Sequence, residues 1–121
     1  MTNGERIEGN RLIAEFMGFV NTTPTDPDFN IYMNTDGVMR ELFGMQYHNR
    51  WDWIMPVVEK IELLNNCRNS ILICKDWVSI NVPIAGEANK FFESKCCRDK
   101  LKNTWNVCVD FIKWHNSQNN G

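Results

Sequence analysis

The sequence predicts an α+β domain: a small antiparallel sheet covered on one face by two amphipathic helices, plus a short N-terminal helix. Two observations lead to this prediction. Apolar residues recur at helical spacing in residues 54–64 and 101–115. A β-branched, apolar stretch at residues 70–83 lies between them. Helical and strand patterns are therefore segregated along the chain, which is typical of the α+β class.

The length and composition fit one folded domain. The chain has 121 residues, of which 43% are hydrophobic and 12% aromatic, far from the composition of a disordered protein. No linker or internal repeat divides it. We expect residues 1–121 to form a single domain, with residues 1–9 and 117–121 as loose tails.

The first half of the chain contains one clear helix signal. Residues 10–18, NRLIAEFMG, begin with a capping Asn10, carry one apolar face and end at Gly18. The following Pro-, Asp- and Asn-rich stretch predicts a loop, in which residues 29–33 form a short edge strand. Residues 38–47 fit a turn of helix or a strand equally well.

Residues 47–62, YHNRWDWIMPVVEKIE, lead into the second helix. Asn49 is the expected N-cap, and Asp52 is suited to the first turn. Pro56 is tolerated only near the helix start. The pattern breaks at Asn65 and Asn66, where we expect the helix to end. Its apolar stripe comprises Ile54, Val57, Val58, Ile61 and Leu64.

The last third of the chain predicts a hairpin and a long helix. Residues 70–83 form two apolar segments on either side of Lys75 and Asp76, as expected for antiparallel strands. Residues 84–95 are expected to be a connecting loop. Residues 95–116 form the long helix. Its apolar face comprises Leu101, Thr104, Trp105, Cys108, Phe111, Ile112 and His115.

Charge and cysteine usage narrow the classes of function. The formal net charge is −2, which makes nucleic-acid binding unlikely because no strong positive field is available. The first ten residues lack the apolar segment of a secretory signal, and no apolar run approaches a membrane span. The five cysteines have no CxxC spacing. These features predict a cytoplasmic protein with reduced thiols and no membrane partner.

No motif for catalysis or metal binding stands out, so we expect neither a metal nor a cofactor. His48 and His115 lack partners at ligand spacing. Residues 26–37 begin like a calcium loop but have Ile31 where glycine is needed and Gly37 where glutamate is needed. A reactive thiolate at Cys96 or Cys97, at the start of the last predicted helix, is the alternative candidate for catalysis.

Six residues are the candidate ligand contacts. Tyr47, His48, Arg50 and Trp51 would form a rim at the start of the second helix. Trp77 and Arg98 could add a stacking surface and a cation. Trp51 shares a helical face with Ile54, Val58 and Ile61, so we expect it to be the buried wedge and Trp53 to be half exposed.

Three segments resemble a family of small uncharacterised bacteriophage and prophage proteins. They are NRLIAEFMGF, YHNRWDWIMPVVEKIE and KLKNTWNVCVDFIKWHN, and they match the family's LIAEFMG, WDWxMPVVEKIE and VxFIKWxN motifs. This chain departs from the family at Asn49 and Arg50, where small hydroxyl residues are usual, and at His115, where tyrosine is more common.

The resemblance implies a phage accessory protein that acts in the cytoplasm of the infected bacterium. Together with the small size and the absence of catalytic motifs, it leads us to expect a non-enzymatic protein. It would bind a host component, for example as a counter-defence protein that blocks a defence protein or sequesters its nucleotide signal. Two alternatives stay open: a structural or assembly protein of the phage, and a small thiol-dependent or nucleotide-processing enzyme. Self-association into a homo-oligomer also stays open.

Overall fold

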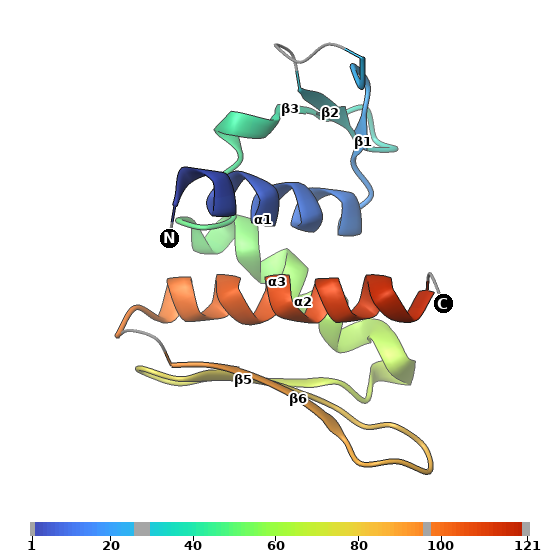
Figure 1. The fold of residues 1–121 in the computed structure, drawn as a ribbon, viewed down its shortest axis with the longest axis vertical. Helices are drawn as coiled ribbons and strands as arrows, with labels where there is room; N and C mark the ends of the chain where they lie inside the picture. Colours follow the sequence, from blue (N-terminus) through green and yellow to red (C-terminus); the bar gives the residue numbers. More distant parts are fainter. Residues whose placement is uncertain (1, 26–29, 96–97, 120–121) are drawn as a thin grey trace.

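The computed structural model describes residues 2–25, 30–95 and 98–119. Three helices lie between two three-stranded antiparallel sheets, one at each end of the long axis (Figure 1). The α+β class is confirmed. The helices are α1 (Asn3–Phe16), α2 (Trp51–Cys67) and α3 (Lys100–Asn119). The sheets comprise β1 (Val20–Asn21), β2 (Ile31–Met33) and β3 (Met39–Glu41), and β4 (Ser70–Ile73), β5 (Val78–Val82) and β6 (Lys90–Ser94).

Helix α1 begins well before the predicted start. The Thr2 hydroxyl accepts a hydrogen bond from the Glu5 backbone N–H at 3.1 Å, and the helix continues from Asn3 through Asn10. The predicted loose tail over residues 1–9 is therefore wrong for residues 3–9. A Thr N-cap followed three residues later by an acidic side chain is the signal that was missed. At the other end, α3 runs to Asn119, so residues 117–119 are helical too.

The small sheet was only partly predicted. Strand β2 lies in the middle of the order β1–β2–β3, not at an edge. Residues 38–47 contain both a strand and a turn of helix, because β3 is followed by a 3-10 turn at Leu42–Gly44. Tyr32 is buried from one face of this sheet, while its neighbours on β2 point the other way.

The larger sheet contains the predicted hairpin and one strand that was not predicted. Ile71 pairs with Ile80, and Ile73 with Val78, across β4 and β5. Residues 90–94 were expected to be loop, but they form β6, in which Phe92 pairs with Ile80. Lys90 and Glu93 obscured the alternation in β6, an edge strand of which only Phe92 and Ser94 are buried.

Helix α3 is the central element of the core. It packs on β5 and β6 on one side and on α1 on the other, and it also contacts α2 (Figure 1). Helices α1 and α3 lie side by side and run in the same direction (Figure 1). The predicted apolar face of α3 is buried at Thr104, Trp105, Cys108, Phe111 and Ile112.

Helix α2 starts and ends differently from a regular helix. Its N-cap is Arg50, which makes no side-chain capping bond, so the predicted Asn49 cap is wrong. Pro56 is the sixth residue of the helix, farther inside than expected. The regular helix breaks at Leu64, and Asn65, Asn66 and Cys67 have positive φ angles of 57°, 57° and 63°. The predicted break at the two asparagines is confirmed.

Candidate functional site

The aromatic residues around the start of α2 are partly packed into the core. Tyr47 is buried, and its ring meets that of Trp53 edge-on at 5.1 Å. The Arg40 guanidinium lies 5.2 Å from the centre of the Trp53 ring. Burial raises the pKa of Tyr47 to about 12, which suits a packing residue rather than an acid–base catalyst.

Of the two tryptophan predictions, the one for Trp51 is wrong and the one for Trp53, half exposed, agrees with the structure. Trp51 is 39% exposed, whereas Trp53 is half-buried and packs against the core. The predicted assignment of Trp51 as the buried wedge is wrong, because helical periodicity does not reveal the distant elements that pack against Trp53 instead. Those elements are β3, which supplies Arg40, and the segment containing Tyr47.

His48 belongs to a hydrogen-bond network centred on α1. The buried Asn10 side chain accepts a bond from Trp105 Nε1 at 2.9 Å and donates from Nδ2 to the Met45 carbonyl at 3.2 Å. The same Nδ2 lies 3.0 Å from His48 Nδ1. Because an indole N–H can only donate, the Asn10 oxygen must face Trp105, and His48 Nδ1 must therefore accept. Burial, with the Arg6 charge nearby, lowers the pKa of His48.

The remaining predicted contacts are on the surface. Arg50 donates from Nε to Asp52 Oδ1 at 3.0 Å, and both side chains are exposed. Trp77 Nε1 donates to Glu93 Oε2 at 2.9 Å. Trp77 and Arg98 line a hollow of about 380 Å3 with Asp76 and Lys95. Cys96 and Cys97 lie outside the described residues.

The six predicted contacts therefore do not form one site. Tyr47 lines a hollow beside α2 together with Arg40, Asp52 and Trp53. Trp77 and Arg98 line the other hollow, and the two share no residue. His48, Arg50 and Trp51 line neither of them.

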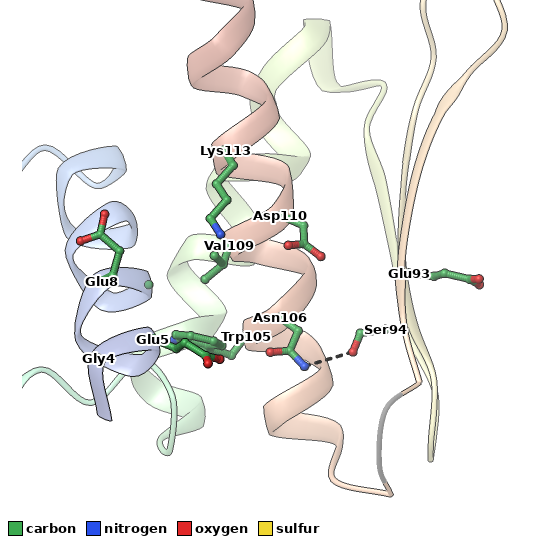
Figure 2. A pocket seen from close by; sticks show the side chains of 11 residues that line it. Gly4, Glu5, Glu8, Glu93, Ser94, Trp105, Asn106, Val109, Asp110 and Lys113 are labelled. Carbon is green, nitrogen blue, oxygen red and sulfur yellow. Dashed lines mark hydrogen bonds between the residues drawn. The ribbon is translucent and has the colours of Figure 1, made fainter. Parts of the chain in front are cut away.

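A cleft of about 500 Å3 lies between α1, α3 and β6 (Figure 2). Glu5 and Trp105 both line this cleft, and Asn106 Nδ2 donates to the Ser94 hydroxyl at 3.2 Å (Figure 2). Glu93 points away from both helices (Figure 2). The described residues contain no group of three or more His, Cys, Asp or Glu side chains that could hold a metal ion. Among the described residues, the acidic groups around this cleft therefore do not form a metal-binding cluster.

The thiols that the structure describes are Cys67, Cys74 and Cys108, and none of them forms a disulfide. Cys108 is fully buried in α3, and burial raises its pKa to about 12. A thiol with such a pKa stays protonated at neutral pH and is a poor nucleophile.

An exposed apolar row on the small sheet was not predicted. Val20 is paired with Met33, and Met33 with Met39, so the three side chains lie in line on one face of the sheet. They are 66%, 41% and 59% exposed. We call these three residues the outer row. The sequence signal for the outer row was limited to the alternation of side chains on either side of Tyr32. The residues that pair across the three strands are distant in the chain, so local periodicity does not reveal them.

Comparison of the chain with protein-family models, curated proteins and solved structures finds no significant match. Within residues 2–25, 30–95 and 98–119, no helix has both the length and the hydrophobicity needed to cross a membrane. What the protein does must therefore be inferred from its own surface.

Proposed function

We propose that this protein is a non-enzymatic bacteriophage accessory protein that binds a protein of the bacterial host through the outer row. The observation that favours binding is the alignment of Val20, Met33 and Met39 across all three strands of the small sheet. The resemblance of three sequence segments to motifs of phage proteins supports the phage setting. In that setting we expect the partner to be a host defence protein.

The shape and composition of the outer row favour a protein partner over a small molecule. Three neighbouring apolar side chains on a sheet present an open surface, whereas small ligands are usually held in concave pockets. Met side chains are flexible and polarisable, so they adapt to apolar partner surfaces. Methionine is also enriched in protein–protein interfaces.

The charges near the outer row indicate what the partner surface should carry. Ile31 and Glu41 are paired on the same face of the sheet, next to the outer row. Asp36 is exposed in the turn between β2 and β3. No lysine or arginine of the three strands points to this face, because Arg40 lies on the opposite face over Trp53. We therefore expect the partner to have an apolar patch bordered by basic residues.

Site-specific photo-crosslinking in the bacterial host tests the proposal. A photoreactive amino acid replaces Met39 in one variant and Leu63 in a control variant. Leu63 is 67% exposed on α2, so it matches Met39 in exposure and apolar character. We expect a host-protein adduct from position 39 only. With the purified partner, Met33→Lys should weaken binding at least tenfold, and Leu63→Lys should not.

Three outcomes would contradict the proposal: no adduct from position 39, equal adducts from both positions, or a phage structural protein as the sole partner. The last outcome would support the assembly role instead. Melting temperatures of the lysine variants check that they remain folded, as expected for exposed positions.

A further inference from the structure

Another pocket lies where the end of α2, the segment after β5 and the last turns of α3 meet. Its volume is about 410 Å3, within the range of small-molecule sites. It shares no residue with the outer row. Most of its wall is apolar, formed by Leu64, Val82, Pro83, Ile84, Ala85, Phe111 and Trp114.

One wall of this pocket contains a packed group of aromatic rings. Phe111 is buried, and the His115 ring stacks on it with 5.7 Å between centres and 16° between planes. Trp114 lies 6.0 Å from Phe111 and is only half-buried. Such rings favour a ligand with a flat apolar part, since offset and edge contacts between rings are attractive.

The polar groups of the pocket favour negative charge. Arg68 lines the pocket, no Asp or Glu does, and among the described residues Arg68 makes no ion pair. Two nearby backbone acceptors are already bonded. Asn69 Nδ2 donates to the Ile61 carbonyl at 3.0 Å, and Asn65 Nδ2 donates to the Pro83 carbonyl at 2.7 Å. These bonds partly satisfy the carbonyl oxygens that would otherwise repel an anion.

The position of Arg68 depends on an unusual backbone. The three preceding residues, Asn65, Asn66 and Cys67, have positive φ, a conformation that costs about 1 kcal/mol or more per non-glycine residue. The Asn65 side chain holds the turn against the segment after β5 through its bond to Pro83. The chain is thus held in the turn that leads to the one arginine of this pocket.

We propose that this pocket binds a small molecule with a flat apolar body and one anionic group, the body against Trp114 and the apolar wall and the anion at Arg68. An aromatic carboxylate and a nucleoside monophosphate share this chemistry. A ligand with a positive charge would find no carboxylate in the wall, and a purely apolar one would leave Arg68 unused.

Titration of the intact protein with two matched pairs of probes tests the proposal. The pairs are 2-naphthoate with 2-naphthylmethanol, and adenosine monophosphate with adenosine. Affinities come from calorimetry, and the site comes from chemical-shift changes of the Trp114 indole. We expect one anion to bind saturably, at least tenfold more tightly than its neutral partner. The pair that shows the preference identifies the source of the ligand.

Three variants locate the site. Arg68→Gln should abolish the preference for the anion, whereas Arg98→Gln removes an equal charge beyond the opposite end of α3 and should leave it unchanged. Ala85→Trp should block binding of anion and neutral probe alike by filling the pocket from its exposed side. Absence of saturable binding by both anions, equal affinity for each anion and its neutral partner, or a preference that survives either Arg68→Gln or Ala85→Trp would overturn the proposal.

Discussion

Asn10 connects three parts of the chain through one buried amide. Its oxygen accepts from Trp105 on α3, and its nitrogen donates to the Met45 carbonyl and to His48 ahead of α2. Buried polar groups need such partners, because an unpaired one retains its full desolvation penalty. The sequence suggested Asn10 only as a helix cap, yet in the structure it is an interior residue of α1.

Replacing Asn10 should therefore destabilise the fold. We expect Asn10→Ala to lower the free energy of unfolding by about 2 kcal/mol, because it leaves Trp105 Nε1 and the Met45 carbonyl without this partner. The exposed Asn49→Ala is the control, with an expected change below about 0.5 kcal/mol. Urea denaturation measures both. A large effect at Asn49 would restore it as the cap of α2, against the structure.

His48 should make stability depend on pH. Its pKa is lowered in the folded state by burial and by Arg6, so the unfolded chain binds a proton more readily. Stability is then complete above the unfolded pKa near 6.5 and falls as the pH drops below it. Protonation at Nδ1 would also place an N–H against the Asn10 amide.

Denaturation at several pH values between 5 and 8 measures this effect. We expect the free energy of unfolding of the natural chain to decrease from pH 7 to pH 5. The decrease should be smaller in His48→Gln, which has no titrating ring. Equal slopes in the two proteins would show that His48 does not contribute.

At the scale of elements, the contact between α1 and α3 depends on a glycine. A Cβ atom at Gly9 would overlap the Cζ2 and Cη2 atoms of the Trp105 ring. A Cβ at Gly4 would meet only the Thr2 hydroxyl oxygen, at 3.9 Å. The same substitution in the same helix should therefore have opposite effects.

We expect Gly9→Ala to destabilise the protein by about 2 kcal/mol or more, because α1 must move away from Trp105. Gly4→Ala should leave stability unchanged or raise it by up to about 1 kcal/mol, since alanine is the better helix former. Thermal melts of the two variants measure the difference. A neutral Gly9→Ala would mean that the helices are not packed this closely.

At the scale of the whole molecule, α3 joins the larger sheet to the other two helices. It contacts β5, β6, α1 and α2, and its core residue Ile112 is fully buried. Loss of packing at α3 therefore affects both halves of the core, and a small domain built this way should unfold in one transition.

Tryptophan fluorescence and far-UV circular dichroism should give the same urea midpoint. Ile112→Ala should shift both midpoints together and lower stability by about 3 kcal/mol, as expected for a truncated core residue. Separate midpoints would mean that the two sheets belong to independently unfolding units.

The sequence by itself determined the fold class, the second and third helices, the break at Asn65 and the hairpin of residues 70–83. Each of these has a local signal: helical or alternating periodicity, or a run of residues that disfavours helix. The start of α1 also had a local signal, the Thr2 cap, but the polar composition of residues 3–9 obscured it.

Only the tertiary structure decided which side chains are available for binding. Trp53 is half-buried and Trp51 exposed because distant segments pack beside α2 on one side. The outer row exists because Val20, Met33 and Met39 come from three strands brought into register. The pocket beside Arg68 likewise depends on residues of α2, β5 and α3. Contacts between residues far apart in the chain decide these surfaces, and periodicity reports only near neighbours.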